Sequence, residues 1–200
     1  DCICVSGNWT PTVHLSSQSG NKLKFDEKIN AFTPNQPRQN ENTIGSANGS
    51  FTLKKSLKDG FDKGFEVSNK LTKKNIKIDP PISNEKSYGN YEKFWCMPLP
   101  KNKDYKRCVD FQNDVYVSDI ELAIREGFRS IEHVKRYTTL GMATDQGKTS
   151  NLNGLQLVSN IENKIVPEVG HTTFRPPYTA VTIGTIVGRE VGKHYRPTRK

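Results

Sequence analysis

The chain has 200 residues, of which 33% are hydrophobic, and a formal net charge of +9. No stretch is long and apolar enough to span a bilayer, and the Lys residues are spread over many loops, so we expect a cytoplasmic protein that binds neither membranes nor nucleic acid. The cysteines lack the paired spacing of a zinc site, so we expect no metal ion and four free thiols in a reducing compartment: Cys2, Cys4, Cys96 and Cys108.

The N-terminal part of the chain alternates short apolar runs with turns. This pattern predicts strands at Cys2–Ser6, Thr12–Leu15 and Lys22–Phe25, with a turn at Ser19–Asn21. The stretch Thr33–Asn48 is rich in Pro, Asn and Gln, which indicates a loop.

A long helix is expected after Ser50, whose hydroxyl can cap its first turn. Apolar residues recur at every fourth position and form one stripe along this helix, at Leu53, Leu57, Phe61 and Phe65. Gly60 and Gly64 lower the intrinsic helix propensity, so we expect them to permit close packing against a neighbouring element. Beyond the helix, residues 71–104 have the composition of a linker, with an aromatic cluster that should anchor it to a larger body: Tyr88, Tyr91, Phe94 and Trp95.

Short helices are predicted between residues 105 and 165. Ser118 and Glu121 have the spacing of a capping box, and the helix they begin should end at Gly127. Ser130 can cap a second helix that ends at about Thr139, and a third should start near Asn151. In the tail, the β-branched run Ala180–Val187 predicts a strand.

The most informative segment is Val134–Asn151, which begins as a basic amphipathic helix and continues as a polar loop containing glycine. A polar loop tied to regular structure on both sides commonly binds a ligand or supports an interface. It is not a phosphate-binding P-loop, because five residues instead of four separate Gly141 from Gly147, and because the segment before it has a helical and not a strand pattern.

The segment Phe111–Asn151, which contains DIELAIREGFRSIEHVKRYTTLGMATDQGKTSN, is long and specific. Together with PEVGHTTFRPPYT in the tail and VSGNWTPTVHL near the start, it resembles the alpha subunit of heterotetrameric sarcosine oxidase. The resemblance implies an α+β, multi-domain piece of a longer polypeptide. Residues 1–70 would end a dinucleotide-binding α/β domain, 71–104 would be a linker, 105–165 would form a small helical domain, and 166–200 would supply the first strand of a folate-binding domain similar to the glycine-cleavage T-protein.

The resemblance also implies an activity. Sarcosine would be oxidised to glycine with formation of peroxide, and the one-carbon unit would pass to tetrahydrofolate. NAD would bind to this subunit, FMN at the interface with the beta subunit, FAD within the beta subunit, and folate beyond Lys200; gamma and delta subunits would complete the complex. We expect no catalytic residue in this chain. Two alternatives stay open: a subunit of a related amine, hydroxyproline or opine dehydrogenase, and a non-catalytic assembly module.

Candidate NAD-binding residues follow from the same resemblance. Flavin-containing relatives carry a Gly-Asp motif where this chain has GSANG, and Ser46 stands in place of the aspartate, which suits a domain that holds NAD. The helix after this motif would support the cofactor with its N-terminal dipole. The candidates are Gly45, Ser46, Ser50 and Thr52.

The helical part further resembles the two-iron domain of bacterioferritin-associated ferredoxins. The ligand positions of that domain fall on Asp110 and Gln112, and near Asp145 and Ser150, and none of them is a cysteine. Such clusters are held by Cys thiolates, so we expect the helical scaffold without its metal. The polar loop left behind lies at a helix N-terminus, and we hypothesise that Lys148, Thr149 and Ser150 approach the FMN phosphate. The alternative is that the loop only caps the helix and contacts protein.

Overall fold

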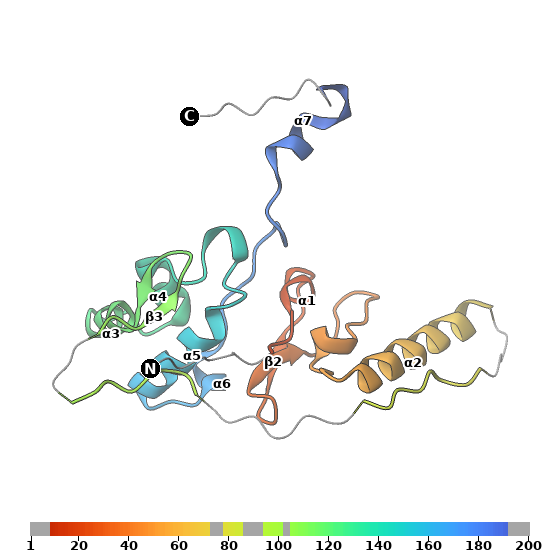
Figure 1. The fold of residues 1–200 in the computed structure, drawn as a ribbon, viewed down its shortest axis with the longest axis horizontal. Helices are drawn as coiled ribbons and strands as arrows, with labels where there is room; N and C mark the ends of the chain where they lie inside the picture. The colour runs from red at the N-terminus through yellow and green to blue at the C-terminus, as the bar shows by residue number, and fades with distance from the viewer. Residues whose placement is uncertain (1–8, 73–77, 86–93, 102–104, 192–200) are drawn as a thin grey trace.

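A computed structural model describes residues 9–72, 78–85, 94–101 and 105–191 of the chain (Figure 1). The predicted strand Cys2–Ser6 and the aromatic residues Tyr88 and Tyr91 lie outside these residues. The described part is a mixed α/β fold with few strands, which form two antiparallel two-stranded sheets.

The N-terminal hairpin consists of β1 (Leu23–Asp26) and β2 (Ala31–Pro34), with Leu23 opposite Pro34 in an antiparallel register. The predicted strand Lys22–Phe25 is therefore confirmed to within one residue. The loop predicted over Thr33–Asn48 is shorter than expected, because β2 includes its first two residues and because Gly45–Asn48 form the 3-10 helix η1. On one face of the hairpin the rings of Phe25 and Phe32 lie 5.3 Å apart.

The strand predicted at Thr12–Leu15 is wrong, since this segment leads into the short helix α1 (His14–Gln18). The Ser17 N–H donates to the Val13 carbonyl at 2.9 Å, and the Ser19 N–H donates to the Leu15 carbonyl at 3.0 Å. These local bonds satisfy the backbone without a neighbouring strand, which is why a helical turn replaces the expected extended segment.

Helix α2 (Leu53–Thr72) is the long helix expected from the sequence, but its cap is Thr52 instead of Ser50. The Lys55 N–H donates to the Thr52 Oγ1 at 3.3 Å. Figure 1 shows that α2 extends away from the remaining elements, and none of its residues is buried. The close packing expected at Gly60 and Gly64 is not present in the described part, because a Cβ at either glycine would have no neighbour within 4 Å.

The helical unit begins with a hairpin that the sequence did not predict, formed by β3 (Cys108–Asp110) and β4 (Val115–Tyr116). Four helices follow, and the first three confirm the predicted helices: α3 (Val117–Arg125), α4 (Ile131–Thr138), α5 (Asn151–Glu162) and α6 (Val166–Val169). A 3-10 turn, η2 (Ala143–Asp145), lies between α4 and α5. The box residue of α3 is Asp119 and not Glu121, because the helix starts two residues earlier than expected and the Tyr116 N–H donates to the Asp119 carboxylate at 2.8 Å.

One hydrophobic core joins α3, α4, α5 and α6, and its central residues are fully buried: Ile120, Val134, Leu140 and Val158. The partly buried rings of Phe25 and Phe32 pack against the same core, so the N-terminal hairpin and the helical unit are not separated in space. The helix α5 approaches Leu140 closely at Gly154, where a Cβ would overlap the Leu140 side chain.

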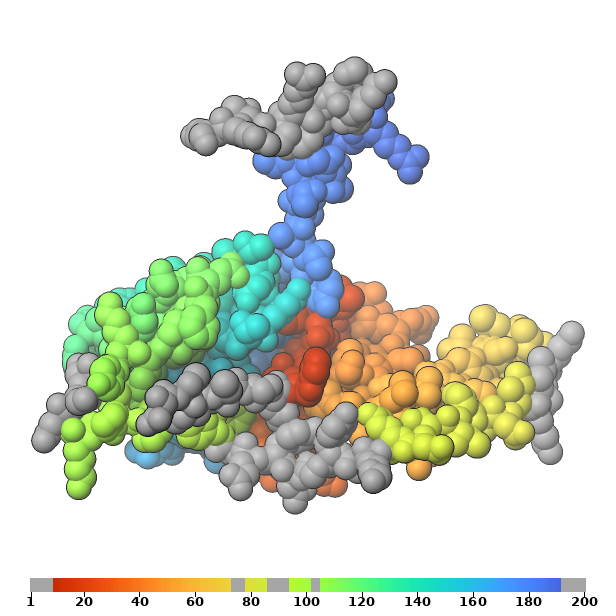
Figure 2. Space-filling view, in the orientation of Figure 1, coloured from red at the N-terminus to blue at the C-terminus, as the bar shows by residue number. Residues whose placement is uncertain are grey.

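The strand predicted at Ala180–Val187 is wrong, since Ile183–Val191 form the helix α7, which is interrupted at Gly188. The Thr182 hydroxyl accepts a hydrogen bond from the Thr185 N–H at 3.3 Å and so caps the first turn of this helix. Figures 1 and 2 show α7 standing off the main body, so a strand there would have no described partner for its backbone groups. Among the described residues no helix is long and apolar enough to cross a membrane.

Candidate functional site

The buried carboxylate of Asp110 organises the polar loop between α4 and α5. Its Oδ2 accepts hydrogen bonds from the Gly141 N–H at 2.8 Å and from the Ser150 hydroxyl at 3.2 Å. Its Oδ1 accepts from the Gln112 N–H at 2.9 Å and from the Asn113 N–H at 3.2 Å. One side chain therefore fastens the end of β3 to both ends of the loop.

These bonds also fix the ionisation state of Asp110. Burial opposes the charged form, but the hydrogen bonds donated by Gly141, Asn113 and Gln112 favour it and lower the pKa of the carboxyl below its ordinary value of 3.8. Asp110 is thus an anion at neutral pH, placed beside the first turn of α5, where the helix dipole favours negative charge.

Two of the four positions that the ferredoxin resemblance singles out, Asp110 and Ser150, are in direct contact. The contact is a hydrogen bond between a carboxylate and a hydroxyl, and neither group is the thiolate that an iron–sulfur cluster requires. Within the described ranges no group of three or more His, Cys, Asp or Glu side chains could hold a metal ion. The residues at these positions therefore do not fit a cluster.

The loop itself is shaped around the Asn151 side chain. Gly141 and Gly147 have positive φ values of 65° and 71°, and a Cβ at either position would overlap the Asn151 amide. The Asn151 Nδ2 donates to the Gln146 carbonyl at 3.1 Å. Both glycines are needed so that the loop can close over this amide.

The three residues proposed to approach a phosphate already have partners within the chain. The Lys148 ammonium donates to the Tyr178 carbonyl at 2.7 Å and lies 4.2 Å from the centre of the Tyr178 ring. The Thr149 hydroxyl contacts the Asp145 carboxylate at 3.4 Å, and the Ser150 hydroxyl faces Asp110. A hydroxyl next to a carboxylate does not suit a second anion, so only Lys148 could be released to bind one; its role stays a prediction.

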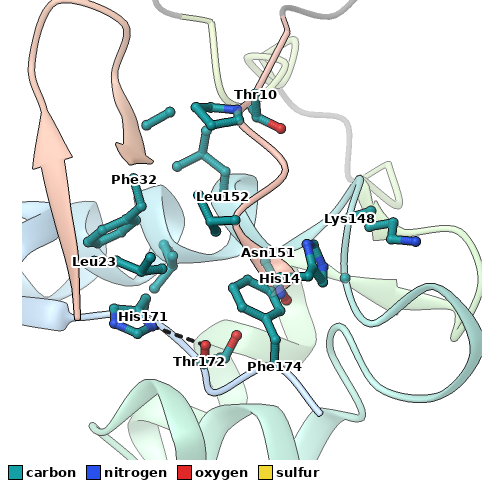
Figure 3. Close-up of a pocket in the computed structure, with 15 residues that line it drawn as sticks. Thr10, His14, Leu23, Phe32, Lys148, Asn151, Leu152, His171, Thr172 and Phe174 are labelled. Atoms are coloured by element: carbon teal, nitrogen blue, oxygen red, sulfur yellow. Dashed lines mark hydrogen bonds between the residues drawn. The ribbon is translucent and has the colours of Figure 1, made fainter. Parts of the chain in front are cut away.

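A cavity of about 470 Å³, including its open mouth, lies between the N-terminal hairpin, α5 and the start of the tail (Figure 3). The His14 side chain is only 4% exposed, and its ring lies 3.9 Å from that of Phe174. Within the part of the chain that the structure describes, neither ring nitrogen of His14 has a hydrogen-bond partner of ordinary geometry, and the same holds for the Asn151 Oδ1 and the Thr172 Oγ1. His14, Asn151 and Thr172 thus bring buried, unpaired polar atoms to the lining of a cavity whose other walls include apolar and aromatic side chains.

The electrostatics of the cavity keep His14 neutral. Burial is the largest effect and lowers the pKa of His14; the nearby Gln146 carbonyl opposes this, and the charge of Lys148 reinforces it. The cavity could not be predicted from the sequence, because its polar residues come from three distant segments and no local pattern shows that these segments meet.

The predicted NAD-binding residues lie on one short connection between β2 and α2. Gly45 begins η1, Ser46 is exposed, and the Ser50 N–H donates to the Gly45 carbonyl at 3.0 Å. The carboxylate of Glu85 already occupies the N-terminus of α2, where it accepts hydrogen bonds from the N–H groups of Leu53 and Lys54. The structure thus brings the four residues together, and their cofactor role stays a prediction.

Comparison with known proteins supports the resemblance found in the sequence. A family model for the sarcosine oxidase A3 domain matches residues 104–189. Over its whole length the chain is 35% identical to the sarcosine oxidase subunit alpha of Rhizobium meliloti (strain 1021) and 34% identical to that of Corynebacterium sp. (strain U-96). The chain belongs to the sarcosine oxidase alpha-subunit family. It spans about a fifth of the length of these relatives, 20% and 21% respectively.

The fold of this sarcosine oxidase alpha-subunit segment also has a counterpart among solved structures. The L-proline dehydrogenase from P. horikoshii superposes with a TM-score of 0.55 over 88% of this chain and 37% of that chain, with 20% sequence identity. The likeness shows a shared fold. The family model covers the helical unit and most of the tail. The Asp110 network and the polar loop therefore lie within the residues that the family model matches.

Proposed function

We propose that this chain forms part of an enzyme complex that oxidises sarcosine to glycine with formation of peroxide and transfers the one-carbon unit to tetrahydrofolate. The observation that carries the proposal is the 35% identity that extends over 100% of the chain, polar loop included, to a protein named as a sarcosine oxidase alpha subunit. The complex would contain beta, gamma and delta subunits and be cytoplasmic.

The finer organisation belongs to the same proposal. Residues 1–70 would complete an NAD-binding domain, 71–104 would connect it to the helical domain at 105–165, and 166–200 would enter a folate-binding domain. FAD would lie in the beta subunit and FMN between the beta subunit and this one. Bound flavin would supply the electron-accepting chemistry, and the residues of this chain would position it and exclude water.

In this proposal Asp110 acts through the loop that it fastens. By holding Gly141 and Ser150 it fixes both ends of the loop, and the loop in turn places Lys148 on the surface next to Tyr178. Lys148 would exchange the Tyr178 carbonyl for the FMN phosphate. A charge-assisted bond to phosphate is stronger than one to a carbonyl, so the exchange is favourable when the flavin is present.

The proposal is tested on the intact complex, purified with all of its subunits. We expect a flavin absorption spectrum and sarcosine-dependent peroxide formation. Lys148→Ala should release FMN more readily than the wild type, and Lys106→Ala, which removes another lysine, should not. A complex without flavin would favour the assembly module, and oxidation of proline, hydroxyproline or an opine in preference to sarcosine would favour a related dehydrogenase. Unchanged FMN retention would remove the role of Lys148 and leave the activity assignment intact.

A further inference from the structure

A second cavity lies on the other side of the polar loop, between α4, the loop and the start of the tail. It measures about 430 Å³ including its mouth. Its charged lining consists of three cations, Lys135, Arg136 and Arg175, and one carboxylate, Glu132. With three positive and one negative side chain, the lining carries a net charge of +2.

Lys135 is the unusual member of the cavity, because its side chain is only 7% exposed. Among the described residues, its ammonium makes one long hydrogen bond, 3.5 Å, to the Thr173 carbonyl. Burial lowers the pKa of Lys135, and the charges of Arg175 and Arg136 add to this effect while Glu132 opposes it. A buried cation without a carboxylate partner is costly, so a compensating anion would stabilise it.

The carboxylate of Glu132 does not meet this need, since it is already engaged. It lies 3.3 Å from the Arg136 guanidinium and accepts the Thr173 N–H at 2.6 Å. The guanidinium of Arg175 forms no ion pair with any described residue in the ranges 9–72, 78–85, 94–101 and 105–191. Lys135 and Arg175 are therefore left as two cations that face the same space.

The cavity is held in shape by bonds that do not involve its cationic groups. The Thr173 N–H is fixed to Glu132, and the Arg175 N–H donates to the Gln146 Oε1 at 3.3 Å. The Gln146 amide in turn donates to the Ala143 carbonyl at 2.7 Å. The backbone that carries Arg175 is thus fastened to the loop, and the site needs little ordering when a ligand enters.

A simpler role for these cations is to balance the negative end of α4. Arg136 serves that role, because it lies in the last turn of α4. A helix terminus carries only about half a charge. Lys135 contacts the tail instead of α4, and Arg175 belongs to the tail, so the helix end does not account for them.

We propose that the cavity formed by Lys135, Arg136 and Arg175 is a binding site for a phosphoryl group. A phosphate dianion matches the net charge of the lining, and Lys and Arg are the side chains that recognise phosphate. The site is separate from Lys148, which is bonded to the Tyr178 carbonyl. The inference does not depend on the proposed oxidation of sarcosine.

Binding of inorganic phosphate to the full chain, measured by calorimetry at constant ionic strength, tests the site. Arg175→Gln removes an exposed side chain and leaves the fold intact, and Lys135→Met keeps the volume of a buried one. Each should weaken phosphate binding about tenfold or more, as expected for the loss of a charge-assisted bond. Arg189→Gln, the same change at an exposed position on α7, should leave binding unchanged.

Two results would overturn the proposal. One is the absence of phosphate binding by the wild-type chain; the other is equal binding by the wild type and Arg175→Gln. Competition distinguishes the source of the phosphoryl group. Displacement of phosphate by FMN but not by riboflavin would assign the site to the phosphate of a flavin, and displacement by neither would assign it to free phosphate; both results support the site.

Discussion

The Ser150 hydroxyl donates a hydrogen bond to the Asp110 carboxylate at 3.2 Å, and the two residues are 40 positions apart in the chain. Both side chains are almost completely buried. The bond joins the end of β3 to the first turn of α5 and therefore determines where the polar loop begins and ends. The two residues stand at or near positions where the ferredoxin resemblance in the sequence would place cluster ligands.

The Asp110 network should contribute a large share of the stability of the helical unit. Asp110→Asn replaces an acceptor oxygen by an amide donor that faces N–H groups, so we expect the free energy of unfolding to fall by about 2 kcal/mol. Asp114→Asn makes the same change at an exposed residue with a φ of 51°, which asparagine tolerates. Urea unfolding monitored by circular dichroism checks both, and equal midpoints for the two variants would show that the network contributes little.

Two glycines on different helices should respond to alanine in opposite directions. At Gly154 a Cβ would overlap Leu140, so Gly154→Ala should destabilise the chain by about 1–3 kcal/mol despite the better helix propensity of alanine. At Gly64 of α2 the space is open, so Gly64→Ala should stabilise that helix by up to about 1 kcal/mol. Thermal unfolding of both variants is the measurement, and a stabilised Gly154→Ala would contradict the close packing of α5.

His14 should make stability depend on pH. Its pKa is lowered in the folded state, chiefly by burial, so the unfolded state takes up the proton more readily. Stability is then fully present above the ordinary pKa of 6.5 and decreases as the pH falls below it, by at most about 1.4 kcal/mol per pH unit. His14→Gln has no titrating group there and should show a flatter profile between pH 7 and 5; an unchanged slope would mean that His14 is readily protonated in the fold.

The helices α3, α4 and α5 of the helical unit could be predicted from the sequence, because capping residues and apolar periodicity are local signals. Ser130 precedes α4 and Asn151 starts α5, as expected. Local signals failed where two structures satisfy the same pattern. The β-branched run at Ala180–Val187 favours a strand by propensity, yet a strand requires a partner and a helix does not, so α7 formed instead.

The candidate site could be predicted only in part, for a related reason. The polar loop is contiguous, and its glycines mark it in the sequence. The partner of Ser150 is Asp110, and His14 and Thr172 come to line the same cavity only after folding. Contacts between distant segments leave no local pattern, which is also why the cationic cavity at Lys135 and Arg175 was not expected.

We propose that the helical unit keeps the scaffold of an iron–sulfur domain and that Asp110 and Ser150 hold it together in place of thiolates. Determination of iron and acid-labile sulfide in the purified intact complex tests this claim most directly. We predict neither element above background, with flavin still present. Stoichiometric iron and sulfide bound to this subunit would contradict the account.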